Sequence, residues 1–364
     1  MKNNKNIIPI IFIIIVALVI MVIKLPNKNN KNNTIKTKNG TVKIVANQEL
    51  TLEEYKNDVF KMEKPKGWVV ETGGAGIYYA IKAYDQKNPN NQIFLMLKME
   101  PLLKSTQSKQ TWQNYYNMSG NNSQYRLFSE AVVLDSPTTE QFYKKFKEIS
   151  AYCNSIEPTL ATFKFPTLNN FTKQDESESQ ASMKSVALDS KVLRATFTGE
   201  NNKAGEGLFL ASIVNFGNSN AGFDTSYYMV YDIMAITTEK DKFIDYKDTL
   251  LKTINSIDFS EEYVKQTIDN NNAQTKRTLE INAQMQKAFD SYMSAWENRN
   301  KTYDIMSQKQ SDAILGYERV YDTETNDIYK TYNGFTDDYQ GDRYKTITDD
   351  MYTEKTSGYI EKIN

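Results

Sequence analysis

The sequence predicts an α+β protein preceded by one transmembrane helix. Three features of the 364-residue chain support this: an apolar run near its start, short β-rich segments separated by turn residues, and neighbouring segments with helical spacing of apolar residues. The expected order is a single N-terminal transmembrane helix, antiparallel sheet packed with helices, a long helix, and a small C-terminal β meander.

The apolar run begins at Ile7 and ends at Ile23, and lysines flank it on both sides. As a helix it would be about 26 Å long, close to the roughly 30 Å hydrocarbon core of a bilayer. A cleaved signal peptide is the alternative, but no A-x-A arrangement of small residues follows the run. The single cysteine, Cys153, is too distant to serve as a lipoprotein anchor. We therefore expect residues 7–24 to form an uncleaved anchor in the lipid bilayer.

Charge alone would place the body of the chain in the cytoplasm. Lysines after the apolar run outnumber Lys2 and Lys5 before it, which the positive-inside rule assigns to the cytoplasmic side. Long domains, however, translocate largely regardless of charge, and lysine is frequent throughout this chain. Frequent Asn, Lys, Ile and Tyr are typical of an A/T-rich bacterial genome. We expect a single-pass protein of a bacterial cell membrane, with its body extracytoplasmic.

Changes in composition divide the chain into six parts. The stretch after the anchor is rich in Lys and Asn and lacks acids, so it cannot bury enough apolar surface to fold. The expected parts are a flank at 1–6, the anchor at 7–24, a flexible linker at 25–49, an α+β region at 50–259, a helical segment at 260–310, and a Tyr-rich acidic hairpin region at 311–364. The α+β region divides into halves, 50–165 and 180–259, in which a Thr-Thr-Glu sequence precedes a helix. A duplication or a common helix-start signal would each explain this likeness.

Residue patterns place strands and helices within the α+β region. Strands are expected near 59–62, 68–71, 77–84, 92–99, 185–188, 192–198, 207–216 and 227–237. Helices are expected at 105–118, 138–153 and 239–257. Cys153 shares one helical face with Phe142, Phe146 and Ile149, so it is expected in the core. The glycines of 73–76 fit a hairpin turn, because a dinucleotide-binding loop would require another glycine where Tyr79 stands.

Two segments of this region resemble a known family. The sequence KMEKPKGW at 61–68 resembles the opening of PsbP-type domains, which are named for an extrinsic photosystem II protein. The helix at 243–259, ending LKTINSIDF, is similar to the end of those domains. The resemblance implies an antiparallel sheet packed with helices over roughly 50–260 and a binding or assembly role, because the family is mostly non-catalytic. It transfers no catalytic or metal-binding residue.

The segment 260–310 contains no Gly or Pro and is expected to be helical. Six apolar or aromatic residues follow a 4-3 spacing along it: Met285, Phe289, Tyr292, Trp296, Tyr303 and Met306. This stripe fits a coiled-coil seam that binds a partner or a second copy. Packing against its own domain is the alternative that we prefer, because the first half of the segment is polar.

Several kinds of chemistry are excluded by composition. The chain has no histidine and one cysteine, which removes Ser-His and Cys-His nucleophiles, histidine-dependent zinc sites and redox cysteine pairs. No serine has a lysine three positions later, and no phosphate-binding loop is present. The net charge of −1 provides no basic field for nucleic acid. Residues 322–327 alternate oxygen donors, but they depart from a calcium-binding EF-hand loop and fit a polar turn better.

We therefore expect no catalytic, cofactor-binding or metal-binding residues and no enzymatic activity. The predicted function is a membrane-anchored extracytoplasmic binding or assembly module of the bacterial cell envelope, with a protein or cell-wall partner. One alternative is a carboxylate-dependent cell-wall or glycan hydrolase, since paired acids suffice for that chemistry. The other is a structural protein that binds a partner through the 285–306 helix.

Overall fold

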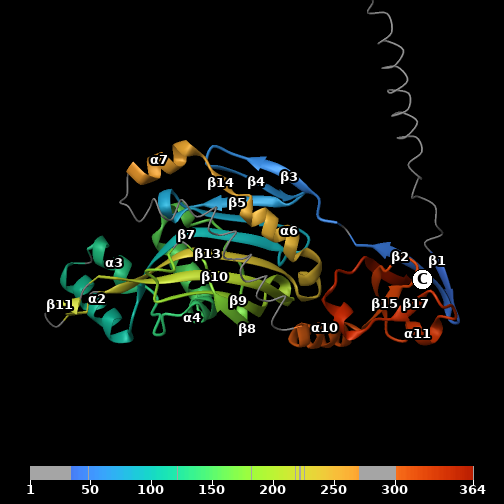
Figure 1. Cartoon of the computed structure of the whole chain (residues 1–364). Helices are drawn as coiled ribbons and strands as arrows, with labels where there is room; N and C mark the ends of the chain where they lie inside the picture. The colour runs from blue at the N-terminus through green and yellow to red at the C-terminus, as the bar shows by residue number, and fades with distance from the viewer. Residues whose placement is uncertain are drawn as a thin grey trace, which may run out of the picture. The chain divides into compact units, whose positions relative to one another are not determined.

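The computed structural model describes residues 34–363 except 48, 121, 182, 218, 221–222, 225 and 270–300. Within this part of the chain, a seven-stranded, a six-stranded and a three-stranded sheet dominate, together with a two-stranded hairpin. The chain divides into two units, each with its own large sheet (Figure 1). The small unit contains the described residues up to Asn47, Glu318–Thr346 and those from Ser357. The large unit contains the described residues of Gln48–Tyr317 and Ile347–Thr356.

The predicted α+β class is wrong, because the described chain is mostly β. Its longest helix, α10 (Lys301–Leu315), has 15 residues, whereas β10 (Ala204–Phe216) and β13 (Tyr227–Glu239) have 13 each. Both strands are buried on both faces over most of their length. Such strands lack the polar alternation that marks a half-buried strand, so a sequence pattern underestimates their extent.

Neither of the two helices predicted outside the sheets appears as a single long element in the part of the chain that the structure describes. Among the described residues, no helix is both long and apolar enough to span a bilayer. The predicted flank at 1–6 and anchor at 7–24 lie outside those residues. The described ends of segment 260–310 form two short helices, α7 (Glu261–Asp269) and α10.

The seven-stranded sheet of the large unit joins both predicted halves of the α+β region. Its order is β5-β6-β7-β13-β10-β9-β8, and every neighbouring pair is antiparallel. The remaining strands are β5 (Val69–Gly73), β6 (Ala80–Tyr84), β7 (Gln92–Leu103), β8 (Asn169–Glu178) and β9 (Asp189–Thr198). The expected hairpin turn after Gly73 is confirmed, because β5 and β6 pair on either side of it. The two central strands, β7 and β13, come from different halves.

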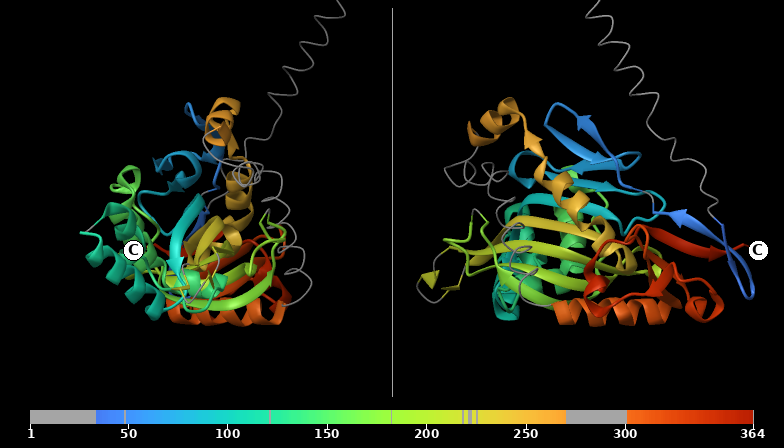
Figure 2. Two further views of the ribbon diagram at one scale, coloured as in Figure 1. Left: turned by 90° about the vertical axis from the view of Figure 1, so that its left-hand side faces the viewer. Right: turned by 45° about the vertical axis from the view of Figure 1, so that its right-hand side comes forward.

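Both faces of this sheet are covered, and the alternation along β7 shows how. Ile93, Leu95 and Leu97 belong to one core cluster, and Phe94 and Met96 belong to the other. The first cluster packs against α6 (Phe243–Asn255) and a small sheet of β3 (Leu52–Lys56), β4 (Phe60–Pro65) and β14 (Asp258–Phe259). The second packs against α4 (Thr139–Lys144) and α5 (Phe146–Ile156). Figure 2 shows these layers from two further directions.

Cys153 on α5 is buried in the second cluster, which confirms its prediction as a core residue. The expected 138–153 helix is divided into α4 and α5 at Lys145. Two further helices, α2 (Thr106–Met118) and α3 (Ser123–Glu130), follow the C-terminal end of β7. Ser105 caps α2 as expected, since its hydroxyl accepts a hydrogen bond from the Ser108 amide.

Shorter elements complete the large unit. They are β11 (Ser219–Asn220), β12 (Phe223–Asp224), and the 3₁₀ turns η1 (Gly76–Tyr78), η2 (Pro158–Leu160), η3 (Glu200–Asn202), η4 (Lys240–Lys242) and η5 (Asp349–Thr353).

The small unit contains a six-stranded sheet in the order β1-β2-β18-β16-β15-β17. Its elements are β1 (Thr34–Thr37), β2 (Gly40–Ala46), β15 (Tyr317–Asp322), β16 (Ile328–Tyr332), α11 (Phe335–Asp338), β17 (Tyr344–Thr346) and β18 (Gly358–Lys362). The predicted C-terminal meander is therefore wrong, because β18 lies parallel to β16 and antiparallel to β2.

Part of the predicted linker belongs to this sheet. Residues 34–46 form the β1-β2 hairpin, in which Val42 is buried and Ile35 and Ile44 pack against the small core. Apolar residues alternate with lysines here, so one face is buried while the charged groups remain in solvent. The high lysine content concealed this alternation.

A buried ionic cluster stabilises the large unit. Arg194 of β9 is 1% exposed, and its Nε donates to Glu206 of β10 at 2.6 Å. Its guanidinium also pairs with Asp304 of α10 and lies 5.2 Å from the Phe243 ring. The cluster therefore links two sheet strands to a helix from a distant part of the sequence.

Removing the cation should leave two buried carboxylates without their partner. We expect Arg194→Ala to lower the free energy of unfolding by about 3–5 kcal/mol. Urea unfolding followed by tryptophan fluorescence measures this loss. Arg126→Ala is the matched control, since Arg126 pairs with Glu130 at the surface and should change stability by less than about 1 kcal/mol. Equal losses for the two variants would contradict a stabilising role of the buried cluster.

Candidate functional site

The predicted partner-binding stripe lies mostly outside the described residues. Met285, Phe289, Tyr292 and Trp296 fall in the gap at 270–300. Tyr303 lies on α10 at a position whose side chain is not described, and Met306 on the same helix is 64% exposed. The stripe therefore stays a prediction.

The acidic turn that we compared with a calcium loop connects β15 and β16. Asp322 at its start is 1% exposed and accepts hydrogen bonds from Arg343 Nε at 2.9 Å and Nη2 at 2.5 Å. Its Oδ1 also accepts from the Glu324 amide. Within the described ranges, no group of three or more acidic or cysteine side chains is arranged to hold a metal ion. The Asp322 carboxylate serves as the partner of Arg343.

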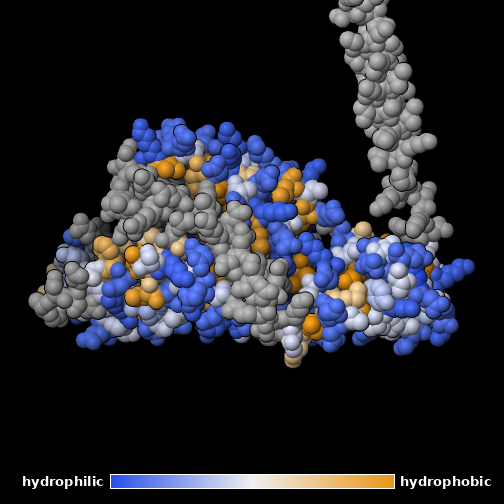
Figure 3. All heavy atoms as spheres, viewed as in Figure 1, coloured by the Kyte–Doolittle hydropathy of each residue, from blue (hydrophilic) through white to orange (hydrophobic). Residues whose placement is uncertain are grey.

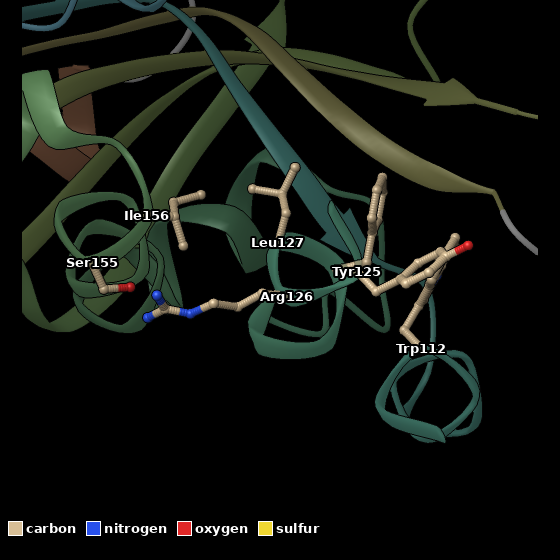
Figure 4. Close-up of a pocket in the computed structure, with 7 residues that line it drawn as sticks. Trp112, Tyr125, Arg126, Leu127, Ser155 and Ile156 are labelled. Carbon is tan, nitrogen blue, oxygen red and sulfur yellow. The ribbon is translucent and has the colours of Figure 1, made fainter. Parts of the chain in front are cut away.

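Two adjoining hollows in the large unit form the candidate ligand-binding site. An outer groove of about 680 Å³ lies among α2, α3 and α5, and an inner cavity of about 200 Å³ lies at the end of β7. Leu127, Phe128 and Ile156 line both. In Figure 4, Trp112 and Tyr125 stand at one end of the outer groove and Arg126 extends toward Ser155. Apolar side chains reach the surface near α2 and α3 in Figure 3.

Backbone contacts place the α2-α3 pair against the sheet. The Leu103 amide at the end of β7 donates to the Val132 carbonyl at 2.8 Å, and the Leu134 amide donates back to Leu103 at 2.8 Å. Tyr152 of α5 donates its hydroxyl to the Leu127 carbonyl at 2.7 Å. These bonds fix the walls of the groove relative to β7 and α5.

Aromatic rings form one continuous wall of the site. The Trp112 and Phe128 rings stack with centroids 4.4 Å apart, and Phe128 meets Tyr227 edge-on at 5.3 Å. Tyr125 lies 6.2 Å from Trp112. Packed rings of this kind have few rotameric alternatives, so the wall is preformed for a flat apolar molecule.

A β-bulge places Glu100 at the inner cavity. On β7, Met99 pairs with Val230 and Leu102 with Tyr228, so Glu100 and Pro101 together face a single residue of β13. An extra residue of this kind bends the strand and redirects a side chain. Proline is tolerated there because it needs no ladder hydrogen bond. Glu100 consequently lines a cavity whose other walls are largely apolar.

The two carboxylate oxygens of Glu100 have different surroundings. Oε1 accepts from the Tyr78 hydroxyl at 2.5 Å and from Lys98 Nζ at 2.5 Å. Oε2 is buried and has no hydrogen-bond partner. The Lys98 Nζ atom lies over the Tyr78 and Tyr231 rings, 5.6 and 5.5 Å from their centroids. One side of the carboxylate is therefore fixed by protein groups, and the other retains an unused acceptor.

Three titratable groups of the cavity, the Tyr78 and Tyr227 hydroxyls and the Cys153 thiol, stay protonated near neutral pH. Burial, reinforced by the Glu100 charge and its hydrogen bond, raises the pKa of the Tyr78 hydroxyl far above its ordinary value. Burial and the same charge raise the pKa of Tyr227 to about 12. Burial, with the Glu157 charge, raises the pKa of the Cys153 thiol to about 12. These groups provide donors and apolar surface, and none of the three is an activated nucleophile.

The outer groove contains one unused donor. The indole Nε1 of Trp112 is buried without a hydrogen-bond partner, whereas Arg126 at the rim is paired with Glu130 at 2.8 Å.

We did not predict this site, although the sequence contains one signal for it. We ended the expected strand at residue 99, immediately before Glu100-Pro101. A charged residue followed by proline within the apolar run QIFLMLKMEPLL is typical of a bulge and not of a strand end. The aromatic wall leaves no local pattern, because Trp112, Phe128 and Tyr227 are far apart in the sequence.

The chain matches no protein-family model and no curated protein. The resemblance to PsbP-type domains therefore stays a prediction.

The Asp322-Arg343 pair predicts a pH-dependent stability of the small unit. Although burial alone would raise the pKa of Asp322, hydrogen bonds and the charge of Arg343 lower it below its ordinary value near 4. Its stabilising contribution is therefore complete above that value and disappears as the pH falls through the lowered pKa. Asp322→Asn should cost about 1–3 kcal/mol at pH 7 and progressively less below pH 4.

Hydrogen exchange of the β15 and β16 amides measures this stability separately from that of the large unit. Glu324→Gln is the control, because its pair with Arg343 is mostly exposed and should contribute little. A cost for Asp322→Asn that stayed constant down to pH 2 would show that the charge of Asp322 is not responsible.

Proposed function

We propose that this protein is a non-catalytic binding module that takes up a small, largely apolar molecule. The observation that supports this most strongly is the inner cavity, in which mostly apolar side chains surround the buried Glu100 Oε2, while Glu157 also lines the cavity and is partly exposed. Ligand sites commonly have this composition, with hydrophobic walls and a few polar groups that orient the ligand. The preformed aromatic wall beside the cavity provides additional surface for a flat molecule.

Attachment to a bacterial membrane is the second part of the proposal. The apolar run from Ile7 to Ile23 supports a single-pass anchor, and we place the body on the extracytoplasmic side. An apolar ligand would concentrate near such a surface, since it partitions from water into lipid.

We prefer ligand binding over the two alternative functions that the sequence suggested. A wall hydrolase would need a pair of free acids flanking a substrate cleft. Two acids line the inner cavity, and both are engaged by protein groups: Glu100 accepts from Lys98, and Glu157 accepts from the Thr159 amide and hydroxyl. A partner-binding helix at 285–306 has no supporting contact within the described parts of the chain. The resemblance of 61–68 and 243–259 to PsbP-type domains agrees with a non-catalytic role.

A methyl NMR titration tests ligand uptake. Met96 and Met99 line the inner cavity, and Met118 and Met306 are exposed elsewhere. When indole is added to the full chain in lipid nanodiscs, we expect saturable shifts of the first two methyl groups and none of the other two. Binding is followed through the methyl signals of the protein, because indole also partitions into the lipid of the nanodiscs. Shifts of all four methyl groups, or of none, would contradict the proposed site.

A blocking variant locates the binding within the two hollows. Ile156 is partly buried and lines both, so Ile156→Trp should weaken indole binding at least about tenfold by filling the space. Glu148→Trp is the matched control, because it places the same side chain at an exposed position of the same helix. Equal affinities of the two variants would place the indole outside the hollows.

Protease treatment of intact cells tests the orientation. External protease should digest the body of the chain while a cytoplasmic marker protein survives. If the body survives until the membrane is permeabilised, the proposed extracytoplasmic location is wrong.

A further inference from the structure

We infer that the inner cavity selects molecules carrying an N–H or O–H donor on a flat apolar body, and that Glu100 Oε2 accepts this donor. This inference rests on the proposed function and adds the chemical class of the ligand.

The unused acceptor is the first reason. A buried polar atom without a partner is costly, so a native structure usually satisfies it with protein, water or ligand. Oε1 already accepts from Tyr78 and Lys98, which holds the carboxylate in place. Oε2 has no protein partner and belongs to a side chain that lines the cavity. A hydrogen-bond donor is therefore the group that this position lacks.

The cavity walls are the second reason. Apart from Glu100 and Glu157, the cavity is lined mainly by apolar groups and rings, among them Met96, Met99, Pro101, Phe128, Leu160 and Tyr227. Thioethers and aromatic rings make favourable contacts with a flat aromatic molecule. A negatively charged group on the ligand would be buried beside the carboxylates of Glu100 and Glu157, which is strongly unfavourable.

The volume limits the size of the ligand. The inner cavity measures about 200 Å³. An engineered apolar cavity of about 150 Å³ in another protein accepts benzene, so this one suits a molecule the size of one or two fused rings. Protein atoms cover Oε2 in the structure. A ligand would reach it after a small rotation of the carboxylate, whose terminal torsion is soft.

Indole and benzofuran provide the test, because they share a shape and differ in the N–H donor. Affinities come from the Met96 and Met99 methyl shifts of the full chain in nanodiscs. Hydrogen bonds to charged groups are among the stronger ones in proteins, so we expect indole to bind at least about tenfold more tightly than benzofuran.

Glu100→Gln should abolish or reverse the preference for indole over benzofuran. Tyr78 and Lys98 both donate to Oε1, so the glutamine carbonyl should take that place and turn its NH₂ group toward the position of Oε2. The cavity would then present a donor in place of an acceptor. Glu148→Gln is the matched control, because it makes the same change at an exposed position of α5 that lines neither hollow, so the preference for indole should persist.

The outcomes separate this inference from the proposed function. Equal affinities for indole and benzofuran in the unsubstituted protein would overturn the donor rule while leaving ligand uptake intact. A preference for indole that survives Glu100→Gln would also overturn it, since another group would then recognise the donor. If Met96 and Met99 respond to neither molecule, the proposed function itself fails. Should Glu100→Gln not fold, the comparison of indole with benzofuran in the unsubstituted protein still decides, because equal affinities overturn the donor rule.

Discussion

The pairing of β7 with β13 is the contact on which the large unit depends. These strands come from different halves of the α+β region, and their antiparallel ladder joins a β5-β6-β7 meander to the strands β8, β9, β10 and β13. Both strands are buried on both faces, so each contributes to two cores at once. The same ladder contains the bulge at Glu100-Pro101. The ladder that joins the two halves of the large unit and the bulge that lines its inner cavity therefore belong to one strand pair.

The bulge explains why a charged group can persist in this position. Glu100 lies where regular pairing is interrupted, and its charge is balanced by Lys98 two residues earlier on the same strand. A buried ion pair of this kind is weak evidence for stability, because desolvation offsets much of the attraction. Retaining it beside an aromatic wall is more easily understood as a means of orienting a bound molecule. The buried Arg194 cluster differs, since it lies between elements of the core and links α10 to the sheet.

Local signals in the sequence predicted local structure well. The Ser105 cap of α2, the hairpin turn after Gly73 and the buried position of Cys153 each follow from a few neighbouring residues, and the structure confirms them. The fold class failed because several strands were not expected, among them β8 and the β1-β2 hairpin, whose polar sequences were interpreted as loop and linker. The linker prediction failed over 34–46 because lysines on the exposed face of the β1-β2 hairpin resemble a solvated tether. The sheet that receives this hairpin is completed by β18, about 300 residues later, which no local pattern reveals.

The candidate site could not be predicted either, because it depends on contacts between residues that are far apart in the sequence. Its wall combines rings from α2, α3 and β13, and its acceptor is distinguished only by the tertiary contacts that occupy the other oxygen. A sequence shows that Glu100 and Pro101 interrupt an apolar run, but it does not show which groups surround them.

A high-resolution crystal structure of the full chain, purified from the cells that make it, tests the central claim most directly. The account predicts electron density for a small organic molecule in the inner cavity, against Met99 and Tyr227, with a donor atom within hydrogen-bond distance of Glu100 Oε2. A cavity that is collapsed, or in which water alone satisfies Oε2, would contradict it.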